Sequence, residues 1–120
     1  MKFQIKIYQI KKDEDLQRKF LFTKLDWLEN GINDVNINNY EMVYENEFNY
    51  ALPENRHEFM DNILEAIFNI FNISSPEDFK GHSLSISDIV EVDGTKYFVD
   101  DYGFVELKNN YMVGENECEY

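Results

Sequence analysis

The chain has 120 residues, of which 43% are hydrophobic, and it carries a formal net charge of −13. That apolar fraction is enough for one packed core, and it excludes an intrinsically disordered chain, which combines high charge with low hydrophobicity. The single cysteine, Cys118, excludes an internal disulfide and a cysteine-based zinc site, and no apolar run approaches the roughly 20 residues that cross a bilayer.

The N-terminal residues predict an amphipathic strand followed by short charged elements. Apolar and polar residues alternate over 3–10, which is typical of a strand with one face on a core. The charged residues 11–15 predict a turn, and residues 16–22 fit a helical turn or an extended piece equally well. We expect a short helix over 24–30, with Thr23 as its N-cap.

A glycine and a run of asparagines separate this short helix from a second predicted strand. Gly31 stands where a helix commonly ends. The asparagine-rich residues 30–39 predict a loop, because asparagine side chains bond to nearby backbone. Residues 40–45 alternate and predict a strand. The acids of this strand are expected to face solvent together, and they are Glu41, Glu45 and Glu47.

The strongest helical pattern runs from residue 56 to residue 72. Apolar side chains recur there at the i, i+3, i+4, i+7 spacing of an amphipathic helix. They are Phe59, Met60, Ile63, Leu64, Ala66, Ile67, Phe68, Ile70 and Phe71. In a small domain such a stripe is more often part of the core than a groove for a partner, so we expect it to pack on the sheet.

The C-terminal third predicts a capped turn of helix and three short strands. Serine, proline and two acids at 75–78 are typical of a helix N-terminus. The pair Asp93–Gly94, between the β-prone residues 87–92 and 95–99, is a strong signal for a hairpin. A further turn leads to a last short strand at 104–107.

This order of elements predicts an α+β fold, in which one long amphipathic helix packs on a mostly antiparallel sheet. Strands and helices do not alternate as consecutive strand–helix–strand units, which disfavours a doubly wound parallel sheet. We expect one domain over 1–107. The acidic C-terminal tail, 108–120, is expected to fray or to add only a small contact.

Residues 57–61 come within one residue of a zinc-protease motif. His57 and Asp61 occupy the two ligand positions of the pattern His-Glu-x-x-His, and the second histidine is replaced. The only other histidine is His82, and such sites need three protein ligands. We therefore expect exposed helix residues here rather than a metal site.

A second segment holds a histidine, three hydroxyls and an acid within seven residues: His82, Ser83, Ser85, Ser87 and Asp88. A Ser-His-Asp triad is defined by its geometry in space, and no Gly-x-Ser-x-Gly elbow is present to expose a nucleophile. Serine and aspartate also shape turns by bonding neighbouring backbone. We expect a structural turn, and the alternatives are a binding role for His82 or hydrolysis by His82 with Asp88.

The aspartates near the C-terminal strands lack the spacing of a calcium loop. They are Asp88, Asp93, Asp100 and Asp101. We expect them to form a solvated rim that can dock a basic partner. The sequence has no glycine-rich phosphate loop, and Cys118 has no basic neighbour that would activate its thiol. We therefore predict that the protein is not an enzyme and uses no metal or cofactor.

The charge is unevenly distributed along the chain. Residues 1–24 carry seven basic and three acidic side chains, whereas residues 25–120 carry four basic and 21 acidic ones. A surface of this sign repels phosphate backbones, so we expect no direct binding to DNA. Acidic side chains can instead occupy a basic groove that normally holds nucleic acid. The alternative is that the charge only confers solubility.

Two motifs resemble the YodL-like domain. Residues 83–88 match its Ser-Leu-Ser-x-Ser-Asp core, and residues 97–104 match its Tyr-x-x-Asp-x-x-Gly-Phe close. The segments 7–10 and 39–44 are also similar to that family. The resemblance covers about residues 1–107.

This resemblance implies a setting rather than a chemistry. The family carries no catalytic residues that can be transferred to this chain, and its members occur in mobile elements of Gram-positive bacteria. The setting implies a counter-defence protein of the anti-CRISPR or antirestriction type in the cytoplasm of a bacterial host cell. We expect an inhibitor of the Cas9 system that occupies a basic nucleic-acid channel, blocks guide-RNA loading or lowers the guide level.

The candidate partner-binding residues are the acids of the predicted strands and turns: Glu41, Glu45, Glu47, Asp93, Asp100, Asp101 and Glu106. Binding through these acids would be sensitive to salt. The alternative is a general protein-interaction module of a mobile element that associates through its tyrosines and phenylalanines. The sequence leaves the choice between monomer and homodimer open, and it predicts no membrane contact.

Overall fold

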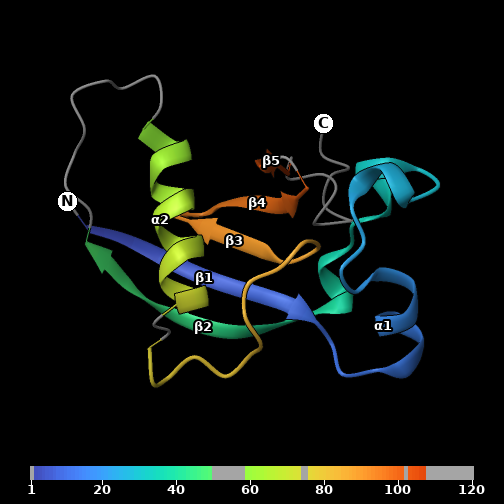
Figure 1. Ribbon diagram of the computed structural model, residues 1–120, viewed down its shortest axis with the longest axis horizontal. Coiled ribbons are helices and arrows are strands. Elements are labelled where there is room, and N and C mark those ends of the chain that lie inside the picture. The colour runs from blue at the N-terminus through green and yellow to red at the C-terminus, as the bar shows by residue number, and fades with distance from the viewer. Residues whose placement is uncertain (1, 50–58, 74–75, 102, 108–120) are drawn as a thin grey trace, which may run out of the picture.

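The computed structural model describes residues 2–49, 59–73, 76–101 and 103–107 (Figure 1). Five strands form one sheet in the order β2-β1-β3-β4-β5, and every neighbouring pair is antiparallel. The strands are β1 (Lys2–Ile10), β2 (Tyr40–Asn49), β3 (Ile89–Val92), β4 (Thr95–Asp100) and β5 (Gly103–Glu106). The mixed class, with helices and an antiparallel sheet, is therefore confirmed.

Strand β1 lies inside the sheet and pairs with β2 on one side and with β3 on the other. Its side chains alternate between the two faces of the sheet. Phe3, Ile5 and Ile7 are buried on one face, whereas Lys6 and Tyr8 are only partly buried on the other. The alternation in the sequence thus directs one apolar row of β1 into the core, as predicted.

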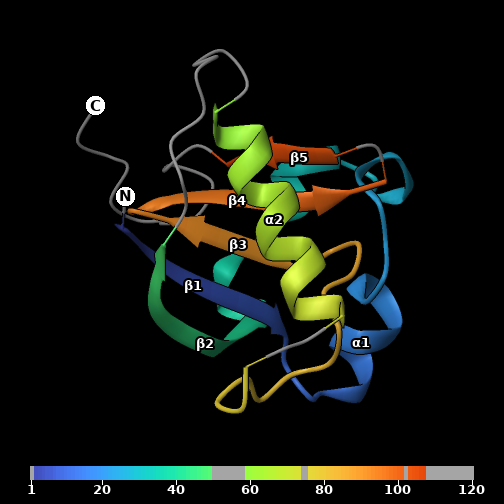
Figure 2. The same cartoon turned by 60° about the vertical axis from the view of Figure 1, so that its left-hand side comes forward.

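Helix α2 (Phe59–Ile73) covers the first face of the sheet (Figures 1 and 2). Its side chains Ile63, Leu64, Ile67 and Phe71 are buried in the main core. The sheet contributes the other buried residues of this core, chiefly Phe3, Ile5, Ile7, Val90, Val92 and Val99. The predicted apolar stripe therefore packs on the sheet.

The second face of the sheet is covered at one end only. Helix α1 (Glu14–Phe20) and three short 3-10 helices, at Leu25–Trp27, Gly31–Asp34 and Ile37–Asn39, lie at that end. They enclose a smaller core made of Ile10, Val35, Tyr40, Ile89, Phe98 and Leu107. The rest of this face carries charged side chains.

The pairing of β1 with β2 shifts register at Val43. Ile7 lies opposite Tyr44, and Tyr8 lies opposite Met42, so Val43 is an extra residue in β2. Such a β-bulge bends a strand and changes which side chains share a face. The carbonyl of Val43 accepts a hydrogen bond from the backbone nitrogen of Lys80, 3.1 Å away, which ties the chain after α2 to this point.

The hairpin between β3 and β4 is confirmed. Asp93 has φ +49° and Gly94 has φ +90°. Positive φ at both central residues is what a type I′ turn requires, and this turn matches the right-handed twist of the two strands. The backbone nitrogen of Asp93 also donates to the carbonyl of Gln4, which extends the pairing of β1 with β3 into the turn.

The expectation of one long helix is wrong. The helical residues are divided between α2, with 15 residues, and α1, with seven. Helix α1 begins in the segment predicted as a charged turn, because the side chain of Asp13 accepts a hydrogen bond from the backbone nitrogen of Leu16 and caps the helix. No helix in the described ranges is long and apolar enough to cross a membrane.

The predicted helix over 24–30 is reduced to the single 3-10 turn at Leu25–Trp27. Thr23 does not cap it, because the Thr23 hydroxyl donates to carbonyls of the preceding residues. Gly31, with φ +59°, starts the next 3-10 turn instead of ending a helix. His57, residues 74–75 and the tail 108–120 lie outside the described residues. The described part of the predicted helix start at 75–78 is a turn at residues 77–78 and not a helix.

Ile67 tests the packing of α2 on the sheet. Its side chain is fully buried, so Ile67→Ala removes apolar contacts and leaves a cavity, which costs about 2–5 kcal/mol of unfolding free energy. Urea denaturation measures this loss. Ile73→Ala, at the end of the same helix, is the control, because Ile73 is 83% exposed. Equal effects of the two substitutions would contradict the assigned face of α2.

Candidate functional site

The segment that carries the predicted motif is held to β1 by one side chain, Gln9. This amide is 2% exposed. Its Oε1 accepts from the backbone nitrogen of His82, at 3.1 Å, and its Nε2 donates to the carbonyl of His82, at 2.9 Å, and to Oδ2 of Asp88, at 3.0 Å. A Cβ at Gly81 would collide with the same amide, so glycine is required there by close approach.

Asp88 is the buried acid of this cluster. Its Oδ2 also accepts from the backbone nitrogen of Ser85, at 2.9 Å, whereas Oδ1 is buried without a hydrogen-bond partner among the described residues. Burial raises the pKa of Asp88 to about 7, although the hydrogen bonds from Ser85 and Gln9 act in the opposite direction. The Asp88 carboxyl is therefore a proton-binding group near neutral pH.

The side chains of His82, Ser85 and Ser87 form hydrogen bonds with backbone groups rather than with one another. His82 Nδ1 lies 2.8 Å from the carbonyl of Ser83, and the Ser85 hydroxyl donates to that same carbonyl at 2.9 Å. The hydroxyl of Ser87 accepts from the backbone nitrogen of Phe22 at 3.0 Å. These contacts are those of a structural turn, and they do not assemble a serine, a histidine and an acid into a triad.

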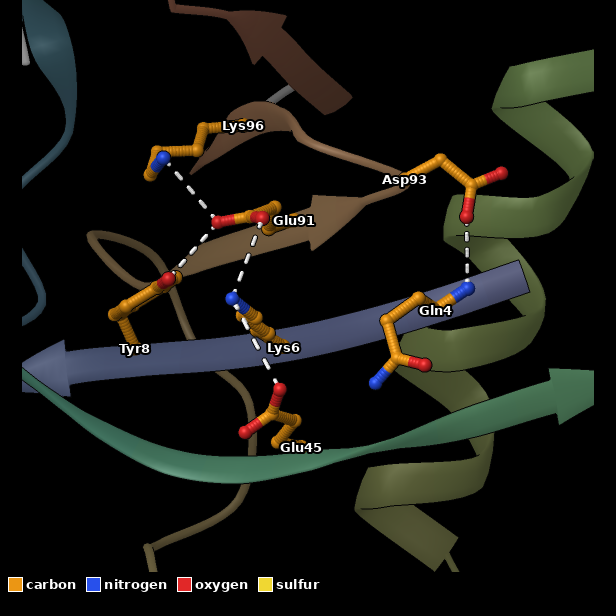
Figure 3. Close-up of polar contacts among 7 residues, drawn as sticks. All are labelled: Gln4, Lys6, Tyr8, Glu45, Glu91, Asp93 and Lys96. Atoms are coloured by element: carbon orange, nitrogen blue, oxygen red, sulfur yellow. Dashed lines mark hydrogen bonds and ion pairs between the residues drawn. The ribbon is translucent and has the colours of Figure 1, made fainter.

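One candidate acid, Glu45, lies on the uncovered part of the second face, in a ladder of charged side chains across four strands (Figure 3). The central acid of this ladder, Glu91, was not among the predicted candidates. Glu91 of β3 lies between two lysines, 3.2 Å from Lys96 and 4.0 Å from Lys6. Lys6 also lies 3.9 Å from Glu45. The hydroxyl of Tyr8 donates to Glu91 at 2.8 Å, and burial and this bond raise the pKa of Tyr8.

Two further candidates on this face are also engaged. Glu47 lies 3.9 Å from the ammonium of Lys2. Asp93 Oδ1 accepts from the backbone nitrogen of Gln4 at 2.8 Å, as Figure 3 shows. The ladder therefore pairs acids with lysines and backbone, and it does not form an unbroken negative patch.

Glu41 lies on the opposite face from Glu45 and Glu47. The bulge at Val43 is the reason, since it inserts one residue between them and reverses which way the chain alternates. Glu41 lies opposite the buried Gln9 instead. The expectation that the three glutamates share one solvent-facing side is wrong.

The last acids lie at the other end of β4 from Asp93. Asp100 Oδ1 accepts from the backbone nitrogen of Leu25 at 3.0 Å, and Asp101 lies 3.2 Å from the ammonium of Lys24. These two contacts hold the 3-10 turn at Leu25–Trp27 against the β4–β5 hairpin. Glu106 is exposed on β5, opposite Tyr97. The candidate acids thus occupy separate places rather than one patch.

Sequence reasoning missed the most exposed aromatic side chain of the described chain, Trp27. It is 68% exposed, and the Lys24 ammonium lies 5.2 Å from the centre of its ring. Two neighbouring acids, Asp26 and Glu29, are also exposed. The sequence did contain a sign of this exposure. The chain's single tryptophan lies between two acids, in a short segment that offers few apolar neighbours to cover it.

Asp88 generates a pH prediction. The pKa of its side chain is about 7 in the folded protein and 3.8 when unperturbed. Between these pH values the folded state holds a proton that the unfolded state has lost. Its contribution to the unfolding free energy therefore falls as pH rises, by at most about 1.4 kcal/mol per pH unit, and levels off above about pH 7.

Asp88→Asn removes this titration and keeps an oxygen that can accept from Gln9 and Ser85. Urea denaturation of both proteins from pH 4 to pH 8 should show the wild type losing stability relative to the variant up to about pH 7. Asp26→Asn removes an exposed carboxylate and is expected to leave the wild-type slope unchanged. Parallel curves for wild type and Asp88→Asn would show that Asp88 is ionised across the range.

Comparison with known proteins identifies one family. No curated protein and no solved structure matches the chain. The sequence profile of the YodL-like domain matches residues 4–110, which include β1 from Gln4 onward, strands β2 to β5 and the segment bonded to Gln9. The chain therefore belongs to the YodL-like domain family.

Proposed function

We propose that the protein is a non-enzymatic inhibitor of a bacterial defence system, of the anti-CRISPR or antirestriction type. It binds a basic nucleic-acid-handling protein, such as Cas9, and occupies a groove for nucleic acid or blocks guide RNA. It acts in the cytoplasm of a bacterial host cell. The observation that supports this proposal best is the exposed Trp27 beside acidic side chains, in a chain of net charge −13.

The binding surface is centred on this tryptophan, and we call it the Trp27 surface. It comprises Asp26, Trp27, Glu29, Asp100 and Asp101. Tryptophan is enriched among the residues that dominate binding energy at protein interfaces, and acids around it favour a partner of positive charge. The negative field speeds encounter with such a partner, and the Trp27 indole slows dissociation once the partner covers it.

The acids of the ladder are less suited to this role. Glu45 and Glu91 already form ion pairs with lysines of the same chain, so a basic partner would have to displace those lysines to reach them. Asp101 also faces a lysine, but Trp27 beside it supplies apolar area that an ion pair lacks. This difference favours the Trp27 surface over the ladder.

A second candidate function is a homodimeric interaction module of a mobile element. The observation that favours it is the position of β2, a strand of ten residues at the edge of the described sheet. An edge strand presents unpaired backbone groups to a second chain. Met42 of β2 is 49% exposed and adds apolar area. Association of this kind is expected to tolerate salt.

A pull-down against Cas9, with and without guide RNA and at low and high salt, tests the proposal. We expect capture that weakens at high salt and competes with guide RNA. Trp27→Ala should weaken binding at least about tenfold without loss of the fold, because the side chain is mostly exposed.

Met42→Ala is the matched control, since it removes an exposed apolar side chain from β2. It should leave capture unchanged. No capture in any state would contradict direct Cas9 binding. Self-association that persists at high salt and is lost in Met42→Ala would favour the homodimeric module.

A further inference from the structure

A hollow lies between α2 and the β4–β5 hairpin, and we call it the hairpin pocket. Its volume is about 330 Å³, near the lower end of the range for ligand sites in proteins. The residues used below are Glu65, Phe68, Ile86, Asp101 and Phe104, all of which line it. A space of this size admits one long side chain rather than a helix or strand.

The walls of the hairpin pocket are aromatic. Phe68 of α2 and Phe104 of β5 meet edge to face, with ring centres 6.3 Å apart and an angle of 74° between their planes. Both rings are only partly buried, so ring surface remains accessible. Ile86 and the buried Val99 complete an apolar lining. An aromatic face attracts a cation through its quadrupole.

The rim of the hairpin pocket is acidic. Glu65 is exposed on α2, and Asp101 is exposed on the hairpin. Among the described residues, no lysine or arginine lies within ion-pair distance of Glu65, whereas Asp101 pairs with Lys24. Glu65 thus offers a carboxylate to a cation brought by another molecule.

We propose that the hairpin pocket receives an arginine side chain of the partner protein. This inference rests on the proposed function, which requires a partner with a basic surface. The guanidinium is planar and weakly hydrated, so it stacks on the accessible aromatic surface while its N–H groups donate to the carboxylate of Glu65. The methylene groups of the side chain pack on the apolar lining. An ammonium is more strongly hydrated and lacks the flat face.

Titration with N-acetyl-arginine amide, followed by backbone amide NMR signals, tests the pocket directly. We expect saturable shifts confined to the residues around Phe68 and Phe104, with a dissociation constant in the millimolar range, about what one cation–π contact and one ion pair provide. The corresponding citrulline amide has the same shape without the charge and should cause no saturable shift. Equal shifts with citrulline, or none with arginine, would overturn the proposal.

Two variants locate the site. Glu65→Gln should weaken arginine binding about fivefold, the size expected for one exposed charge pair. Glu14→Gln on α1 makes the same charge change at another exposed position and should leave binding unchanged. Phe104→Leu keeps an apolar wall but removes the ring, and it should also weaken binding while circular dichroism shows an unchanged fold. Equal effects of Glu65→Gln and Glu14→Gln would overturn the assignment.

The pull-down separates this inference from the proposed function. Capture of Cas9 that depends on Trp27 but is unaffected by Glu65→Gln would leave the function standing and overturn the pocket as part of the interface. Arginine binding that Glu65→Gln weakens, without capture of Cas9, would support the pocket and remove that target.

Discussion

A single buried amide joins strand β1, inside the sheet, to the segment between α2 and β3. Gln9 uses both ends of its side chain, so its loss would remove two hydrogen bonds from the backbone of His82 and one of the two that Oδ2 of the buried Asp88 accepts. Each such bond typically contributes about 0.5–1.5 kcal/mol of stability. Asp88 also joins this segment to β4, because its backbone carbonyl accepts a hydrogen bond from the backbone nitrogen of Val99. The amide therefore fixes where β3 begins, and with it the position of the β3–β4 hairpin.

Several acids of this protein stabilise the fold by accepting hydrogen bonds from backbone nitrogens. Asp13 caps α1, Asp93 bonds to β1, and Asp100 holds the turn at Leu25–Trp27. Backbone N–H groups satisfied by carboxylates need no lysine, which explains how a chain with a large excess of acids can still order its loops. The net charge therefore does not locate a binding surface. The exposure and apolar area of particular side chains do.

Local patterns in the sequence predicted the parts of the fold that local chemistry determines. The alternation over 3–10 and the pair Asp93–Gly94 identify a strand and a turn without knowledge of any neighbour. The bulge at Val43 could not be predicted, because it is a feature of the pairing between β1 and β2, which are far apart in the sequence, and no local pattern marks it. Gln9 did leave a signal: it is the polar residue that follows Phe3, Ile5 and Ile7 on one face of β1.

The Trp27 surface and the hairpin pocket meet at Asp101. At this point a carboxylate and an aromatic ring together bind a cation of the same chain. The Lys24 ammonium lies 3.2 Å from the Asp101 carboxylate and 5.2 Å from the centre of the Trp27 ring. On the pocket side of the same hairpin, Phe104 and Glu65 offer a ring and a carboxylate without a cation from the described chain. A basic partner docked on Trp27, as proposed, is therefore also next to an aromatic and acidic pocket that has the chemistry to hold a second cation.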